Sequence, residues 1–133
     1  MHFFSVLTTF DRYILQEIAV SEYQIKSRIW VGSEKGMLLG EGRIALLREI
    51  DKRGSISKAA KAMDMSYKKA WRLVDEMNRN AKAPFVQQKI GGKGGGGTVL
   101  SDAGLKAIRI YTKLQEKEHA FLREQEIWLQ NEL

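Results

Sequence analysis

The sequence predicts a mainly α-helical protein with a small β-wing, organised as a winged helix-turn-helix followed by a long C-terminal helix. Two short helical patterns lie within residues 55–79, separated by a break at residues 63–65. A basic, glycine-saturated segment at residues 89–97 lies between two short β-like runs. We expect an N-terminal extension with helical character over residues 1–23, the winged domain over residues 24–100, and a dimerisation helix over residues 101–133.

Length and charge limit the possible classes of protein. At 133 residues the chain accommodates one domain plus an arm or an assembly element. The net charge is +6, and residues 43–93 hold 13 basic and five acidic side chains, so this segment is +8 and the rest is −2. A local positive field favours a polyanionic partner, because each phosphate that Lys or Arg neutralises releases condensed counterions. The alternative is a solvated basic surface.

Composition also excludes several chemistries. There is no Cys, which removes disulfides, zinc-thiolate sites and Cys nucleophiles and is consistent with a cytoplasmic location. No apolar run approaches about 18 residues, so no membrane partner is expected, and the N-terminus lacks the basic flank of a signal peptide. His2 and His119 have no supporting ligand spacing. We therefore expect no metal, no cofactor and no enzymatic activity.

The first part of the chain predicts a helix and then a hairpin. A stripe with helical spacing indicates an amphipathic helix over residues 3–20, which could pack on a partner subunit or form a leader; the stripe consists of Phe3, Leu7, Phe10, Ile14 and Ile18. Residues 25–31 alternate between apolar and polar side chains, which predicts a strand. Residues 37–39 are its expected hairpin partner.

Three helices follow. The first runs from Arg43, buries one apolar face and stops at Gly54. Ser55 or Ser57 caps the second helix, whose alanines permit the close approach of two crossing helices. Asp64 forms the turn, and Ser66 caps the third helix.

The third helix has an apolar side and a basic side. The residues expected to face inward are Ala70, Leu73, Val74 and Met77, and those expected to face outward are Lys68, Lys69, Arg72 and Arg79. Basic residues at the N-terminal end are typical of a recognition helix that contacts bases and phosphates. Tyr67, in the first turn, is a candidate DNA contact, whereas Trp71 is expected in the core or against the wing.

The wing is predicted from strands at residues 85–90 and 98–100. The loop between them, residues 91–97, contains six glycines and Lys93, so its backbone can approach a sugar-phosphate surface closely. Residues 92–97 formally match a dinucleotide-binding glycine motif, but a strand follows where a helix is required. Gly94 stands where a P-loop needs Ser or Thr. A flexible linker is the stronger alternative, and the flanking β-like runs argue against it.

The last helix begins at Ser101 and Asp102 and has an apolar residue every seven positions. These residues are Ala107, Leu114, Phe121 and Trp128. A helix longer than a small domain can cover most economically buries such a stripe against a second subunit. We therefore expect a homodimer.

Three stretches, GSISKAA at residues 54–60, MSYKKAW at residues 65–71 and GGKGGGGTVLS at residues 91–101, resemble the DNA-binding domain of the ModE family of molybdenum-responsive transcriptional regulators. The helix-turn-helix stretch alone is also similar to LysR-type regulators. The similarity covers about residues 24–115. It implies a winged helix, a homodimer on a two-fold-related operator, and control of transcription. It also implies that residues 66–69 lie at the major groove and Lys93 at the wing.

The expected contacts to double-stranded DNA are Ser57, Lys58, Ser66, Tyr67, Lys68, Lys69, Arg72, Gly92, Lys93 and Gly94. The sequence departs from the molybdate-sensing members because it stops at Leu133, without the further C-terminal oxyanion-binding region. Molybdate binding by this chain is therefore not expected, while a separate sensor subunit or protein stays open. The alternative function is a basic interaction module that binds RNA or an acidic protein.

Overall fold

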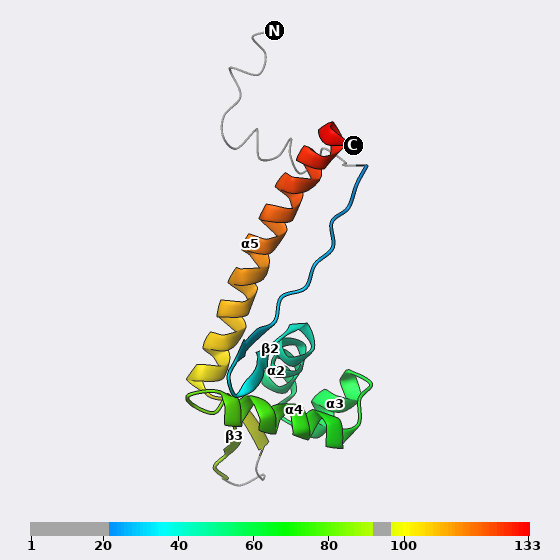
Figure 1. The fold of residues 1–133 in the computed structure, drawn as a ribbon. Coiled ribbons are helices and arrows are strands. Elements are labelled where there is room, and N and C mark those ends of the chain that lie inside the picture. The colour runs from blue at the N-terminus through cyan, green and yellow to red at the C-terminus, as the bar shows by residue number, and fades with distance from the viewer. Residues whose placement is uncertain (1–21, 92–96) are drawn as a thin grey trace, which may run out of the picture. The chain divides into compact units, whose positions relative to one another are not determined.

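The computed structural model describes residues 22–91 and 97–133, so the helix expected over residues 3–20 lies outside the described residues (Figure 1). The elements in chain order are β1 (Val31–Ser33), β2 (Gly36–Leu39), α2 (Glu41–Arg53), α3 (Ile56–Ala62), α4 (Tyr67–Asn80), β3 (Val86–Lys89), β4 (Gly97–Leu100) and α5 (Asp102–Glu132). The described part is mostly helical with two antiparallel hairpins, β1–β2 and β3–β4, which is compatible with the predicted combination of helices and a small β-wing.

The chain divides into two compact units. Residues 27–118 form one unit, and the described residues 22–26 and 119–133 belong to the other, so α5 contributes to both. In the smaller unit the backbone N–H of Ile25 donates to Oε1 of Glu126 at 3.1 Å. The helix-turn-helix and both hairpins lie in the unit of residues 27–118.

The first hairpin is shorter than the sequence predicts. Val31 is partnered with Leu39 and Ser33 with Gly36, and the register shifts after Val31. The predicted strand at residues 25–31 is therefore wrong except at its last residue, because β2 ends at Leu39 and the preceding backbone has no strand to pair with. The carbonyl of Ile29 instead accepts a hydrogen bond from the hydroxyl of Tyr111, at 2.9 Å.

Helix α2 starts at Glu41, slightly before the predicted start, and ends at Gly54 as predicted. Gly54 has φ 68°, and its N–H donates to the Ile50 carbonyl at 2.8 Å, which is a left-handed C-cap that glycine adopts without strain. Ser55, rather than Ser57, then caps α3, because its Oγ accepts from the backbone N–H of Lys58 at 3.2 Å. Helix α3 packs on both α2 and α4.

The core of this unit draws side chains from every one of its helices and from three of its four strands. It consists of Leu39, Ile44, Leu46, Leu47, Ile50, Ile56, Ala59, Ala60, Ala70, Leu73, Val74, Met77, Phe85, Val86, Leu100, Ala107 and Tyr111. All the positions predicted to face inward from α4 are buried. The small Ala59 and Ala60 are buried too, which fits the close packing of α3 on its neighbours.

The second hairpin is held to the helices at its root. Strands β3 and β4 pair in regular register from Val86 opposite Leu100 to Lys89 opposite Gly97, close to the predicted strands. Oδ1 of Asn78 accepts from the backbone N–H groups of Phe85 and Val86, at 2.9 and 3.1 Å. Nδ2 of the same side chain donates to the Val86 carbonyl at 2.9 Å. One α4 side chain therefore fixes where the hairpin starts.

Candidate nucleic-acid interface

The turn between α3 and α4 determines how α4 begins. Asp64 has φ 53°, and the N–H of Met65 donates back to the Ala60 carbonyl at 3.0 Å. Asp is one of the few residues with a side chain that tolerate this left-handed conformation. Ser66 then caps α4, because its Oγ accepts from the N–H of Lys69 at 3.1 Å, as predicted.

The N-terminal end of α4 presents unpaired cations. Lys68 and Lys69 are exposed, and neither forms an ion pair with any residue that the structure describes. The end of a helix at which N–H groups point outward carries a partial positive charge, which adds to the two ammonium groups. This end of α4 therefore attracts anions.

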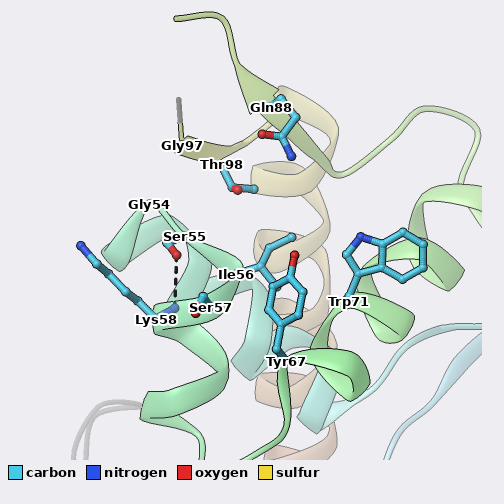
Figure 2. A pocket seen from close by; sticks show the side chains of 10 residues that line it. All are labelled: Gly54, Ser55, Ile56, Ser57, Lys58, Tyr67, Trp71, Gln88, Gly97 and Thr98. Carbon is cyan, nitrogen blue, oxygen red and sulfur yellow. Dashed lines mark hydrogen bonds between the residues drawn. The ribbon is translucent and has the colours of Figure 1, made fainter. Parts of the chain in front are cut away.

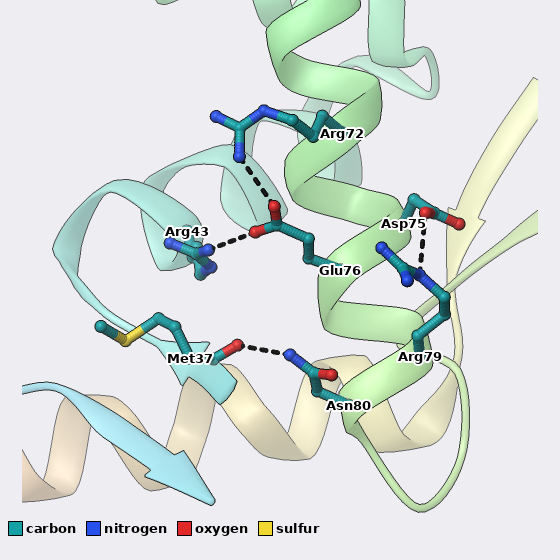
Figure 3. Close-up of polar contacts among 7 residues, drawn as sticks. All are labelled: Met37, Arg43, Arg72, Asp75, Glu76, Arg79 and Asn80. Carbon is teal, nitrogen blue, oxygen red and sulfur yellow. Dashed lines mark hydrogen bonds and ion pairs between the residues drawn. The ribbon is translucent and has the colours of Figure 1, made fainter. Parts of the chain in front are cut away.

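The remaining α4 cations are paired within the protein (Figure 3). Glu76 accepts from Arg72 at 2.7 Å and from Arg43 of α2 at 2.6 Å, and Arg79 pairs with Asp75 at 2.9 Å. Burial alone would raise the pKa of Glu76, but the hydrogen bond from Arg72 and the charges of both arginines outweigh it and lower that pKa. The uncompensated positive charge of α4 is thus concentrated at its start.

A cleft of about 460 Å³ lies between α3, α4 and the second hairpin (Figure 2). Its lining residues are Gly54, Ser55, Ile56, Ser57, Lys58, Tyr67, Trp71, Gln88, Gly97 and Thr98. The backbone N–H of Thr98 donates to the Gly54 carbonyl at 2.9 Å, which joins β4 to the end of α2. This bond holds the loop-side half of the hairpin beside the helix-turn-helix.

Trp71 is not a core residue. Its side chain is 52% exposed and lies on the wall of the cleft, with Gln88 and Thr98 also in the lining, so of the two expected positions the core is wrong and the place beside the second hairpin fits. The reason is helical geometry: the buried stripe of α4 starts at Ala70 and continues through Leu73 and Val74, and position 71 lies outside that stripe.

The predicted contact residues are distributed around the start of α4. Ser57, Lys58 and Tyr67 line the 460 Å³ cleft. Ser57, Ser66 and Tyr67 also border a hollow of about 440 Å³ over the α3–α4 turn. Lys68 and Arg72 are exposed on α4 but line neither hollow, and Gly92, Lys93 and Gly94 lie outside the described residues.

Sequence reasoning missed two sets of residues at this surface. Gln88 and Thr98 are partners in the register of the hairpin, and both line the cleft. Their pairing across the two strands is the part that the predicted strands could have indicated. Arg28 and Arg43 are the second set, and they line another hollow, of about 310 Å³, together with the predicted contact Lys69. Arg28 belongs to the segment that was expected to be a strand, so its proximity to α4 could not be anticipated.

The predicted dimerisation stripe of α5 is not uniform. Ala107 is 4% exposed and is part of the core of residues 27–118, whereas Leu114 is half-buried. Phe121 and Trp128 are 60% and 56% exposed. The exposed apolar surface of the stripe therefore lies toward the C-terminal end of the helix.

Two classes of feature are absent from the described residues 22–91 and 97–133. No cluster of three or more His, Asp or Glu side chains there has a geometry that could hold a metal ion. No helix among them is both long enough and apolar enough to cross a membrane.

A capped helix with a basic start, packed across a turn on a short preceding helix, defines a helix-turn-helix protein. The chain is similar to regulators of the ModE family. It is 40% identical over 89 residues to the molybdenum transport protein ModE of Azotobacter vinelandii. The aligned stretch covers 67% of this chain and 33% of the relative. No family model matches the chain.

Two further relatives, both ModE regulators, are similar to the same share of this chain or slightly less. The transcriptional regulator ModE of Haemophilus influenzae is 37% identical over 89 residues, covering 66% of this chain and 35% of the relative. The DNA-binding transcriptional dual regulator ModE of Escherichia coli (strain K12) is 45% identical over 80 residues, covering 59% and 30%. The chain spans about a third of the length of these relatives. The resemblance to the ModE family is thereby confirmed for about two thirds of the chain.

Proposed function

We propose that this chain is a sequence-specific double-stranded DNA-binding regulator of transcription, with α4 as the recognition helix of a winged helix. The observation that carries the proposal is the pair of exposed lysines, Lys68 and Lys69, at the Ser66-capped start of α4. Neither lysine is paired with a carboxylate among the described residues. The names of the ModE relatives support the same function.

With α4 in the major groove, residues of both α3 and α4 can contact the DNA. In helix-turn-helix proteins the N-terminal residues of the second helix contact base edges, while the preceding helix lies against the backbone. Tyr67 and Lys68 then face bases and phosphates, and Ser57 and Lys58 at the start of α3 are available to the backbone. Arg72 donates to Glu76 through Nη1 alone, so its other N–H groups are available to a phosphate while that carboxylate fixes the position of the guanidinium.

The second hairpin acts as the wing in this proposal. Its root is fixed by Asn78, and the bond between Thr98 and Gly54 holds β4 near its loop-side end, so a wing contact is made from a rigid base. Residues 92–94, which include Lys93, are proposed to follow the sugar-phosphate backbone, where small residues permit close approach.

We also propose that two copies associate through α5. Residues seven apart lie on one side of a helix, and Phe121 and Trp128 expose large apolar side chains at that spacing.

Sedimentation tests this association and should give a mass of twice 15.2 kDa. Leu114→Glu with Phe121→Glu should give monomers, whereas Arg123→Glu, an exposed change on the opposite side of α5, should not; a monomeric wild type at micromolar concentration would refute the dimer.

The direct test of function is selection of duplexes from a random-sequence pool. We expect enrichment of a shared sequence, and we expect bound duplex to resist competition by RNA and by an acidic protein at equal salt. Enrichment without a shared sequence would contradict sequence-specific recognition. Displacement by RNA or by the acidic protein at concentrations below that of competing duplex would favour the alternative, a basic interaction module.

A further inference from the structure

Two large aromatic side chains are exposed beside the proposed DNA contacts. Tyr67 is 56% and Trp71 is 52% exposed, and they are four residues apart on α4. Figure 2 shows both rings extending from α4 on the side of the cleft bounded by Gln88 and Thr98. Large aromatics in a folded domain usually bury most of their area, so exposure of two adjacent rings indicates a surface that is completed by a ligand.

The polar atoms of these rings are not used inside the protein. Neither the Tyr67 hydroxyl nor the Trp71 indole N–H has a hydrogen-bond partner among the described residues. Tyr111 provides the contrast, because it is 1% exposed and its hydroxyl donates to the Ile29 carbonyl at 2.9 Å. Tyr111 is a structural aromatic of the core, whereas Tyr67 and Trp71 present both an apolar ring and a free donor to the outside.

Trp71 stands where two hollows meet. It lines the 460 Å³ cleft and also a smaller hollow of about 200 Å³, bordered by Val74, Asn78 and Val86. The packed stripe of α4 lies behind it. Its ring therefore lies between the start of α4 and the hairpin, at a place that none of the described residues covers.

DNA offers one strongly apolar group at the base edges of its major groove, the 5-methyl group of thymine. Lysines 68 and 69 supply attraction to phosphates, which carries no sequence information by itself. We propose that Trp71, together with Tyr67, contacts thymine 5-methyl groups and so determines the base sequence that this protein prefers. This inference rests on the proposed function and assigns to Trp71 a role in specificity that its exposure and its position support.

The test compares thymine with deoxyuridine, which lacks only the methyl group. A duplex recovered from a random-sequence pool by the full chain is synthesised with each thymine replaced in turn. Removing one buried methyl contact should weaken wild-type binding about four-fold at one or more positions. Trp71→Ala should bind more weakly and should lose this preference at one or more of these positions, where the thymine and deoxyuridine duplexes should then bind with equal affinity; a preference kept at another position is assigned to Tyr67.

Two controls separate this result from other effects. Trp30→Ala removes an equally exposed indole, 60% accessible, that does not line the cleft, and it should keep the four-fold preference. Circular dichroism and thermal melting should show that Trp71→Ala is folded, as expected for a half-exposed side chain. If it is not, Trp71→Phe provides the second variant, and it should retain a reduced preference.

The possible failures are distinguishable. If no duplex is enriched, the proposed function fails. If duplex is bound but no thymine shows a preference over deoxyuridine, or if Trp71→Ala keeps the preference at every such position, this inference is overturned while the proposed function stands. An equal loss of affinity for single-stranded DNA in Trp71→Ala would also overturn it, because it would indicate base stacking instead of methyl contact.

Discussion

The guanidinium of Arg43 and the carboxylate of Glu76 join α2 to α4 through an ion pair of 2.6 Å (Figure 3). Both side chains are largely covered, at 18% and 27% exposed. The other oxygen of Glu76 accepts from Arg72 at 2.7 Å. A single carboxylate therefore connects α2 to the exposed face of α4.

Glu76→Gln should destabilise the protein in a pH-dependent way. Hydrogen bonds to charged groups contribute about 1.5–3 kcal/mol, so a loss of about that size is expected at pH 7. Because the pKa of Glu76 is lowered in the folded state, this stability is present above the ordinary glutamate pKa of about 4.3 and is lost as the pH falls through the folded value. Melting curves of wild type and variant between pH 7 and pH 3 should converge in acid; a constant difference would contradict the account.

The N-terminal cap of α4 should contribute measurably to the free energy of unfolding. Ser66→Ala removes the acceptor for the Lys69 N–H and should cost about 1 kcal/mol in the free energy of unfolding, measured with urea. Ser57→Ala is the matched control, since Ser57 is exposed and does not cap α3. Equal losses in the two variants would show that the cap contributes nothing specific.

Two helical glycines should respond in opposite directions to alanine. A Cβ at Gly104 would lie 2.3 Å from the Phe85 carbonyl oxygen, so Gly104→Ala must push α5 from the hairpin and should destabilise by about 1–3 kcal/mol or more. A Cβ at Gly42 would meet nothing within 4 Å. Gly42→Ala in α2 should stabilise by about 0.5–1 kcal/mol. Thermal melting of both variants measures the two stability changes. An unchanged stability in Gly104→Ala would argue against the close packing of Gly104 on Phe85.

Asn78 should control the order of the hairpin. Asn78→Ala removes three hydrogen bonds to the hairpin backbone and leaves the N–H groups of Phe85 and Val86 without their acceptor. We expect a loss of about 1–3 kcal/mol and faster amide exchange at both positions. Asn78→Asp keeps the acceptor and should retain slow exchange there. Fast exchange in both variants would assign the effect to the lost donor instead.

Local chemistry made much of this fold predictable. The Ser66 cap, the Gly54 stop and the inward face of α4 depend on residues a few positions apart, where residue type and helical period are decisive. The failures depend on distant partners. Residues 25–30 alternate like a strand but have no paired neighbour, and Ile29 instead meets Tyr111, far along the chain.

In the candidate interface, too, features set by neighbouring residues were predictable and features set by distant partners were not. Lys68 and Lys69 follow from helical geometry alone. The pairing of Arg72 with Glu76 and the exposure of Trp71 depend on how α4 is packed against α2 and the hairpin, which no local pattern specifies. The burial of Ala107 also depends on packing between distant elements. Its heptad position predicts a contact with a second subunit, whereas in the structure it belongs to the core.

The most direct test of the central claim is the salt dependence of duplex binding by Lys68→Ala with Lys69→Ala. Each lost phosphate contact should reduce the slope of log affinity against log salt by about 0.9. The double variant should therefore bind more weakly with a slope smaller by about 1.8 if both contacts are lost, while Lys106→Ala with Lys113→Ala, two exposed lysines of α5, should leave the slope unchanged. An unchanged affinity and slope in the first variant would contradict the assignment of α4 as the recognition helix.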